Sequence, residues 1–227
     1  MEAVAVIVAA GEGRRVGGDT PKQFEDLGGI PVLAWSVRTF LRHAGVGQVV
    51  VVLAPSVASE PPGWLTSRHV RVVAGGETRQ ESVRRGVAAV PEDARTILIH
   101  DAARPFASRD LIDRVLESCR ETGTVPGVGV RDTLKRTQGS RVAETVDRSD
   151  LVAAQTPQGF PAQVIRRLHE TGRAVQATDD AMLCEIAGEA VTVVAGEDLN
   201  FKITTAADLA YARWLVESAV VACPNPV

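Results

Sequence analysis

Short runs of aliphatic and β-branched residues alternate with helical patterns along most of this chain of 227 residues. Several of the runs are apolar throughout, as is typical of parallel strands that helices cover on both faces. Alternation of this kind predicts a layered α/β domain with a mostly parallel sheet flanked by helices. The strands that we expect lie at residues 4–9, 48–53, 70–74, 96–99, 124–130 and 191–194.

Capping signals and apolar periodicity mark the helices between those strands. Pro31 suits the first turn of a helix, and Thr78 followed by Glu81 matches a capping box. Thr178-Asp179-Asp180 before an apolar run indicates a further helix start with acids in its first turn. The longer helices that we expect lie at residues 31–43, 78–90, 108–123 and 205–221.

The composition limits the class of protein. Hydrophobic residues make up 45% of the chain and charged residues 23%, so we expect a single globular domain over residues 1–227. The formal net charge of −3 argues against nucleic-acid or anionic-membrane binding, since both need a basic face. No apolar stretch is long enough to span a bilayer and no basic leader precedes the first strand, so we expect a cytoplasmic protein.

Two residue types are rare. Cys119, Cys184 and Cys223 lie far apart with no CxxC spacing, so neither a disulfide framework nor a zinc site is predicted. Lysine accounts for only three of the 25 basic residues, and two of them are Lys22 and Lys202. When an arginine-rich chain keeps lysine at a position, this favours a role that needs a compact point charge, such as binding a phosphate group.

The α/β rhythm breaks at residues 131–150. Two alternating polar and apolar segments flank a Gln138-Gly139-Ser140 turn, which predicts a hairpin that stands off the sheet as an arm. Because an isolated hairpin is marginal in water, it needs something to pack on, either its own subunit or a second one.

A glycine-rich loop follows the first predicted strand, at the sheet edge where backbone N–H groups can face a phosphate. The dinucleotide-binding fingerprint fails because Val16 stands at the third glycine position. The Walker A pattern fails because Asp19-Thr20 stands where Lys-Ser/Thr is needed. A third interpretation is a nucleotidyltransferase loop in which Arg15 and Lys22 bring fixed positive charge to a triphosphate. The alternative is a tight turn with surface arginines, which the loop taken alone favours.

The fourth predicted strand ends in His100-Asp101-Ala102-Ala103-Arg104, at the same edge. Asp101 is well placed to hold Mg²⁺ while a triphosphate supplies other ligands, and Arg104 to hold a phosphate. The alternative for Asp101 is a cap on the following turn. For His100 we favour a packed histidine over a catalytic one. Asp180 is a weaker candidate for a second metal contact.

Eight motifs occur in order between about Val4 and Trp214. Together they closely resemble those of the 2-C-methyl-D-erythritol 4-phosphate cytidylyltransferases, a family of the non-mevalonate isoprenoid pathway. The motifs are Ala9-Ala10-Gly11 with Gly13-Arg14-Arg15 and Pro21-Lys22-Gln23, Gly75-Gly76-Glu77-Thr78-Arg79 with Ser82-Val83, His100-Asp101-Ala102-Ala103-Arg104-Pro105, Arg131-Asp132-Thr133-Leu134-Lys135, Val146-Asp147-Arg148, Gln155-Thr156-Pro157-Gln158, Thr178-Asp179-Asp180-Ala181 and Phe201-Lys202-Ile203-Thr204.

This resemblance implies a Rossmann-like nucleotidyltransferase fold whose β-arm interlocks two subunits of a homodimer. It implies that cytidylyl is transferred from CTP, with Mg²⁺, to 2-C-methyl-D-erythritol 4-phosphate. Arg15 and Lys22 would stabilise the transition state, and Arg148 and Lys202 would position the acceptor phosphate. Thr133 and Arg148 would reach the neighbour's site from the arm.

The remaining residues that the resemblance assigns line the two substrate sites. Arg104 and Thr178 would contact the acceptor, while Asp101 would hold the metal. The residues implied at the cytidine pocket are Ala10, Gly11, Gly76, Glu77, Ser82 and Ala102.

Two alternatives stay open for the activity. A ribitol-5-phosphate cytidylyltransferase would share the glycine loop, the strand-end Asp and the lysine motif, and would differ on the acceptor side. A non-catalytic nucleotide sensor on the same fold should have lost one of Arg15, Lys22, Asp101 or Lys202, and all four are present. A fusion with a downstream cyclodiphosphate synthase needs a further domain's length, so we do not expect one. We expect residues 219–227 to be a disordered tail.

Overall fold

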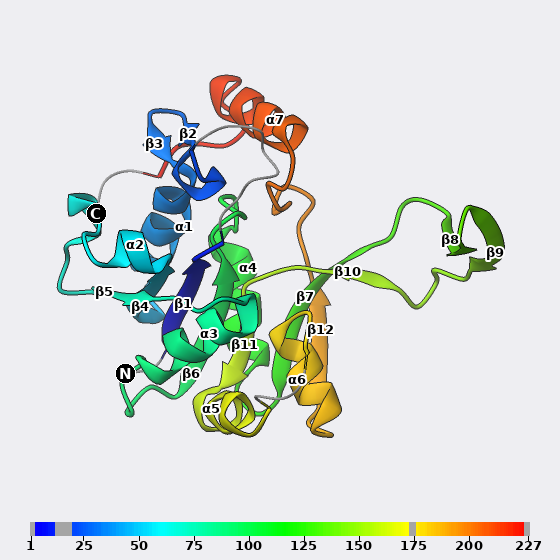
Figure 1. Ribbon diagram of the computed structural model, residues 1–227, viewed down its shortest axis with the longest axis horizontal. Helices are drawn as coiled ribbons and strands as arrows, with labels where there is room; N and C mark the ends of the chain where they lie inside the picture. Colours follow the sequence, from blue (N-terminus) through cyan, green and yellow to red (C-terminus); the bar gives the residue numbers. More distant parts are fainter. Residues whose placement is uncertain (1–2, 12–19, 173–175, 225–227) are drawn as a thin grey trace.

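The computed structural model describes residues 3–11, 20–172 and 176–224. Figure 1 shows a central twisted sheet with helices on both sides and a long hairpin that projects from one end. The strands follow the order β10-β7-β11-β6-β1-β4-β5, and β12 also pairs with β7. The strands are β1 (Ala3–Ala9), β4 (Val46–Leu53), β5 (Val70–Ala74), β6 (Thr96–Asp101), β7 (Gly123–Gly129), β10 (Val152–Ala154), β11 (Gln158–Pro161) and β12 (Val191–Ala195).

Most of the sheet is parallel, as predicted. β1 pairs with β4 and β6, β4 with β5, and β12 with β7, all in parallel register. β11 runs antiparallel between β6 and β7, and β10 runs antiparallel to β7. The six predicted strands are therefore confirmed to within two residues at either end, whereas the two antiparallel strands were not predicted.

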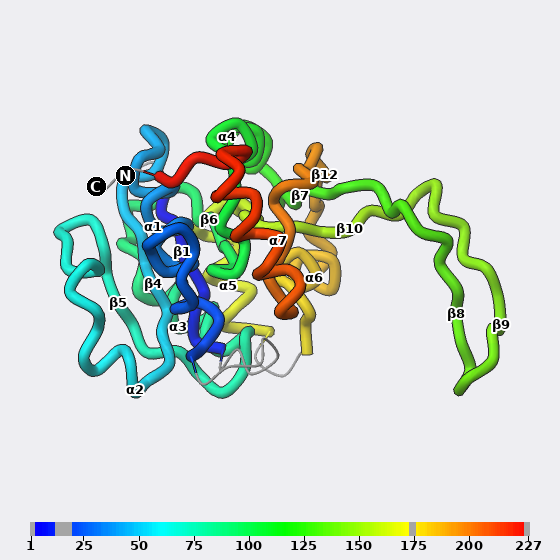
Figure 2. The backbone as a smooth tube through the Cα atoms, turned by 90° about the horizontal axis from the view of Figure 1, so that it is seen from above, coloured from blue at the N-terminus to red at the C-terminus, as the bar shows by residue number. Residues whose placement is uncertain are grey.

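Side chains alternate across the sheet and create two separate cores. Val6, Val52 and Ile99 face one layer of helices, whereas Ile7, Val51 and Leu98 face the other. Figure 2 shows α1 and α4 on one side of the strands and α3, α5 and α6 on the opposite side. The helices are α1 (Val32–Leu41), α2 (Pro55–Ala58), α3 (Arg79–Ala88), α4 (Arg109–Ser118), α5 (Ala162–Thr171), α6 (Asp180–Ile186) and α7 (Ala206–Glu217), with short 3-10 turns at Lys22–Phe24 and Gly63–Leu65.

Three side-chain caps form at helix starts. The capping box predicted for Thr78 and Glu81 forms in one direction, since the Glu81 carboxylate accepts from the Glu77 amide. The Thr78 hydroxyl accepts from the Glu81 amide, the Ser108 hydroxyl from the Leu111 amide, and the Asp179 carboxylate from the Met182 amide. The helix that we expected from Pro31 begins one residue later, with Pro31 as its N-cap. A helix that was not predicted, α5, covers the same sheet face as α3.

A third cluster of buried residues packs α7 against the N-terminal part of α1. Trp35 and Leu215 are buried here, and the Trp35 indole N–H donates to the carbonyl of Leu27, 2.8 Å away. Leu27 belongs to the small hairpin of β2 (Asp26–Leu27) and β3 (Ile30–Pro31). This cluster includes Ile203, so it anchors the segment that carries Lys202.

The arm is a two-stranded ribbon that forms its own sheet, as predicted. β8 (Leu134–Gln138) pairs antiparallel with β9 (Arg141–Val146), and Gly139 takes a positive φ of 58° at the turn. Its side chains are mostly exposed, Val142 among them with 61% of its surface accessible. Figure 1 shows the ribbon well away from the sheet and its helices, so its apolar side chains have no core to cover them within the described chain.

Part of the expected C-terminal tail has a defined place. The Val220 and Val221 amides donate to the carbonyl of Leu215, and Val221 packs on the α7 cluster. Arg38 Nη1 donates to the carbonyl of Pro224 over 3.0 Å. Residues 219–224 thus differ from the expectation of disorder because they continue the packing of α7, whereas residues 225–227 lie outside the described residues.

Candidate active site

A cavity of about 270 Å³ opens at the carboxyl edge of the sheet, where β1 and β6 end. Its walls come from the loop after β1, the start of α3, the end of β6 and the segment before α7. It gathers nine of the residues predicted to bind the substrates or the metal ion or to stabilise the transition state. They are Ala10, Gly11, Lys22, Gly76, Glu77, Ser82, Asp101, Ala102 and Lys202.

The loop after β1 is anchored by Gln23. Its side-chain amide donates to the carbonyls of Ala9 and Gly11, 2.9 Å away in each case, and only 4% of the residue is exposed. This links both ends of the glycine-rich loop and aims Lys22 at the cavity. Arg15 is among residues 12–19, which lie outside the described residues, so its predicted role stays a prediction.

The opposite wall is built from the turn between β5 and α3. The Ser82 hydroxyl accepts from the Gly76 amide at 3.0 Å and donates to the Gly76 carbonyl at 3.3 Å. At Gly75 an added Cβ would lie 2.4 Å from the Ala10 Cβ, so only glycine lets this turn approach the β1 loop so closely. The close approach brings Gly76 and Glu77 to the cavity.

Asp101 ends β6 and lies at the centre of the charges. Its carboxylate is 2.7 Å from Lys202 Nζ and 3.2 Å from Arg79 Nε, and 12% of its side chain is exposed. Burial alone would raise the pKa of Asp101, but the charges of Arg79 and Lys202 outweigh burial and hold it well below the usual range. Asp101 is therefore an anion throughout the physiological range, surrounded by cations.

The two rare lysines converge on this region. Lys22 Nζ donates to the carbonyl of Ile203 at 3.0 Å, one residue away from Lys202. Lys202 is half-exposed, and its ammonium group faces Asp101. The argument from lysine rarity therefore selected two side chains that share one cavity.

A second, smaller cavity of about 170 Å³ lies beside the first. It shares Arg79, Asp101 and Lys202 with the first cavity, and Arg104 and Thr178 line it as well. Arg104 Nη1 donates to the carbonyl of Asn200 at 2.8 Å, and burial lowers the pKa of its guanidinium from the ordinary value. Three of the residues that we expected at the acceptor, Arg104, Thr178 and Lys202, thus lie together next to the nucleotide cavity.

His100 is a packed residue, as the sequence interpretation favoured. It is fully buried, with Nδ1 3.1 Å from the Thr156 hydroxyl and Nε2 2.9 Å from the carbonyl of Arg104. Burial lowers its pKa to about 4, so the ring is neutral at physiological pH. It supports the turn that carries Arg104.

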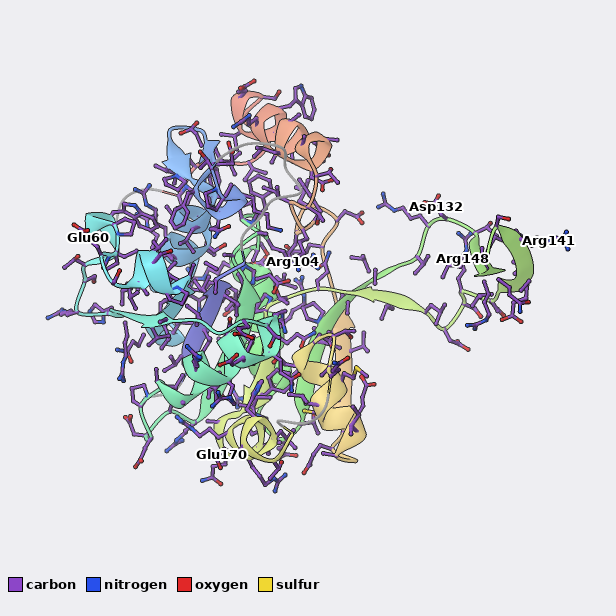
Figure 3. The ribbon with its side chains drawn as sticks, in the orientation of Figure 1. Glu60, Arg104, Asp132, Arg141, Arg148 and Glu170 are labelled. Carbon is purple, nitrogen blue, oxygen red and sulfur yellow. The ribbon has the colours of Figure 1, made fainter. Side chains whose placement is uncertain are left out.

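Thr133 and Arg148 do not join these cavities within one chain. Figure 3 shows Arg148 on the arm, far from Arg104 at the edge of the sheet. The Arg148 guanidinium donates to the carbonyl of Arg131 across the base of the hairpin. Their predicted part in catalysis therefore needs a second copy of the chain.

The donor set accommodates a magnesium ion through a single protein carboxylate. Among the described residues no three His, Cys, Asp or Glu side chains cluster as metal ligands. Mg²⁺ in nucleotide enzymes is bound by one or two carboxylates together with substrate phosphates, and Asp101 fits that description. Asp180 lies 2.9 Å from Arg79 Nη1 and 3.1 Å from His169 Nε2 and lines neither cavity, so its weaker candidacy as a second metal contact stays a prediction.

Sequence reasoning assigned no role to Arg79 or Gln23, although both stand inside quoted motifs. Arg79 lines both cavities. The signal that would have found it is its place directly after the Thr78 cap, which puts its side chain at the N-terminal end of α3. For Gln23 the signal is its position directly after Lys22, where a side chain can fix the segment that carries the lysine.

Known proteins resemble this chain over nearly its whole length. Residues 3–218 match the family model described as 2-C-methyl-D-erythritol 4-phosphate cytidylyltransferase (IspD). The enzyme of that name from Rhodococcus jostii is 44% identical, and the match covers 94% of this chain and 95% of the relative. The crystal structure of the one from Thermus thermophilus has a TM-score of 0.81 and 37% identity, over 95% of this chain and 98% of that one.

Other relatives are longer than this chain. The bifunctional enzyme IspD/IspF of Nitratidesulfovibrio vulgaris is 43% identical over 225 residues, which cover 92% of this chain and 57% of the relative. The chain therefore spans little more than half the length of such bifunctional relatives. The comparisons confirm the predicted α/β nucleotidyltransferase fold. Among the described residues, no helix has the length and apolar character to cross a membrane.

Proposed function

The chain belongs to the 2-C-methyl-D-erythritol 4-phosphate cytidylyltransferase family, and on that premise we propose that it transfers cytidylyl from CTP to 2-C-methyl-D-erythritol 4-phosphate. One observation carries the proposal. Two adjoining cavities at the carboxyl edge of the sheet share Asp101, Lys202 and Arg79, so a nucleotide in one cavity and a phosphorylated acceptor in the other would meet at a cluster of cations.

The chemistry follows from that meeting point. A phosphate oxygen of the acceptor attacks the α-phosphorus of CTP, a new P–O bond forms, and the bond to the bridging oxygen of the β-phosphate breaks to release pyrophosphate. The acceptor phosphate is already ionised at pH 7, so no general base is needed. Catalysis then consists of positioning and of stabilising negative charge on the equatorial oxygens and the leaving group.

The residues divide by cavity. We assign Lys22 and Arg15 to the triphosphate, and Lys202, Arg104 and Thr178 to the acceptor. Cytidine would lie against the turn and loop residues of the larger cavity. These are Ala10, Gly11, Gly76, Glu77, Ser82 and Ala102.

Magnesium is part of the proposal. Asp101 would hold it, and the ion would neutralise triphosphate charge during transfer. Both oxygens of Asp101 contact cations in the free chain, since Oδ1 faces Arg79 and Oδ2 faces Lys202. A carboxylate has about four acceptor sites in all, so these contacts still allow it to bind a metal ion.

We further propose a homodimer in which each arm completes the partner's site with Thr133 and Arg148. The support is the exposed ribbon of β8 and β9, which has apolar side chains but no core of its own. Mixing an Arg148→Ala chain with a Lys22→Ala chain tests this. If each site combines an arm and a body from different chains, mixed dimers hold one intact site and regain activity; no recovery after subunit exchange would reject the composite site.

For localisation and other partners we propose a cytoplasmic enzyme that binds neither nucleic acid nor membrane. The net charge of −3 supports this, because such surfaces require a basic face. Retention by heparin or by anionic vesicles at physiological salt would contradict it.

The decisive assay is pyrophosphate release by the purified protein with CTP and Mg²⁺. It compares 2-C-methyl-D-erythritol 4-phosphate with ribitol 5-phosphate and repeats the better pair with ATP, GTP and UTP. Release with CTP and the branched acceptor alone supports the proposal. Release with ribitol 5-phosphate alone keeps the chemistry and replaces the acceptor, whereas CTP binding without release from either acceptor indicates a nucleotide sensor.

A further inference from the structure

Arg79 lines both cavities of the site, yet neither the motifs nor the family resemblance assigns it a role. The other two residues that both cavities share are Asp101 and Lys202, which already have assigned parts. A side chain that lies on the boundary between nucleotide and acceptor is next to the atoms between which the new bond forms.

Two carboxylates hold the Arg79 guanidinium in place. Nε is 3.2 Å from Asp101 Oδ1 and Nη1 is 2.9 Å from Asp180 Oδ2. The side chain is 29% exposed, so it still reaches the solvent of the cavities. These contacts use two of the five N–H donors of a guanidinium, a group whose planar fork suits phosphate oxygens.

Asp180 is the fixed end of this arrangement. Only 1% of it is exposed, and it is the first residue of α6. Its Oδ1 is 3.1 Å from His169 Nε2, and its backbone N–H donates to Gln158 Oε1 at 3.1 Å. These contacts fix Asp180, and Asp180 in turn fixes one end of the Arg79 guanidinium.

Charge balance keeps Arg79 charged. Burial alone would lower its pKa, but Asp180 and Asp101 outweigh burial and raise it. Asp180 is the more deeply buried carboxylate, and Asp101 has the ammonium group of Lys202 as a second cation, so we expect Asp180 to hold Arg79 more firmly than Asp101 does. The contact between Arg79 and Asp101 is therefore the one that we expect substrate phosphates to replace.

From this placement we propose that Arg79 is a further substrate-binding residue, which contacts the phosphates of both substrates at the boundary of the two cavities. Asp180, supported by His169, is the positioning residue that acts through it. The inference deepens the proposed function and rests on it. It also gives the buried Asp180, which lines neither cavity, a part in the site through Arg79.

The test uses Arg79→Gln, Arg79→Lys, Asp180→Asn and the double variant Arg79→Gln/Asp180→Asn. Arg84→Gln is the matched control, since Arg84 lies on the same helix, is 32% exposed and lines neither cavity. The double variant removes the cation and its buried counter-charge together, so it remains informative if Arg79→Gln alone unfolds. Circular dichroism and melting temperature establish folding before kcat, both KM values and calorimetric CTP affinity are measured.

Loss of Arg79 should lower kcat/KM about 100-fold and weaken CTP binding without acceptor. Arg79→Lys should recover part of this, because a lysine keeps the charge but not the fork. Asp180→Asn should cost about 10-fold to 100-fold. The distinguishing result is non-additivity: if Asp180 acts only through Arg79, the double variant is no slower than Arg79→Gln.

Folded Arg79→Gln with kcat/KM within about threefold of the control would overturn the proposal. So would a double variant whose losses multiply, since Asp180 would then act independently. If the unaltered protein releases no pyrophosphate but loses CTP affinity on Arg79→Gln, the proposed transfer fails while the nucleotide contact of Arg79 stands.

Discussion

Gly86 lies in the middle of α3, where glycine is normally unfavourable. Its removal should nevertheless destabilise this protein. An added Cβ would lie 2.5 Å from Val6 Cγ1 and 2.7 Å from Val52 Cγ2, inside contact distance of two buried side chains on β1 and β4. Neither valine has a flexible end that can move aside, because both are fully buried.

Two opposing effects set the size of the change for Gly86→Ala. Alanine gains about 1 kcal/mol of helix propensity over glycine. Overpacking costs about 1–3 kcal/mol, and two simultaneous clashes place this site near the upper end. The net loss is then about 2 kcal/mol, equivalent to a fall in melting temperature of about 4–8 °C for a chain of this size.

Urea unfolding of Gly86→Ala and of the unaltered protein measures this directly. The displaced helix carries Arg79 and Ser82, so turnover should fall as well. Val6→Ala removes one of the two clashing methyl groups, and the double variant should lose less stability than the sum of the single changes. Equal or higher stability of Gly86→Ala would refute the close helix–sheet contact on which the reasoning depends.

Three further predictions concern the site and its supports. Lys22→Ala should lower turnover by orders of magnitude while the melting temperature stays near normal, and a near-normal rate of pyrophosphate release would remove Lys22 from its role. Burial holds the pKa of His100 near 4, below its ordinary 6.5, so the unfolded chain binds a proton in that window that the folded chain does not. Stability should therefore be complete above pH 6.5 and decline by up to about 3 kcal/mol as the pH falls toward 4, and His100→Gln should lack this component in urea unfolding at several pH values. Thr205→Ala should cost about 1 kcal/mol of unfolding free energy, because Thr205 caps α7 and forms a reciprocal capping box with Asp208.

The parallel strands were predictable because their apolar runs are long and buried on both faces. β11 was missed for an equally physical reason. It is four residues long, begins with Gln158 and contains Gly159, so it has no strand pattern of its own. Gly159 is required by packing, since an added Cβ would lie 2.6 Å from Val115 Cγ1 on α4. The glycine at position 159 is therefore explained by its contact with α4, and a strand's local sequence does not reveal such a contact.

The residues of the site that could be predicted are those whose position follows from a single strand or loop and its local motif. Asp101 ends a strand and Lys22 follows a glycine loop, and in both cases local sequence indicates a position at the same sheet edge. The pairing of Arg79 with Asp180 joins residues 101 positions apart. No local pattern distinguishes such a carboxylate from a helix cap or a metal ligand, so the sequence alone could not predict that Asp180 pairs with Arg79.

Charge balance accounts for the way in which this site is assembled. Arg79 and Lys202 would repel each other without Asp101, which contacts both, and without Asp180, which contacts Arg79. The two buried carboxylates would in turn be costly without these cations. Asp101 is shared by both cations at the open edge, whereas Asp180 is buried and has His169 as its second partner. Anionic substrates can therefore displace the shared carboxylate from its cations while the buried one keeps Arg79 in place. A site built this way holds its positive charge oriented before the substrates arrive, which is the condition under which electrostatic stabilisation of a transition state is most effective.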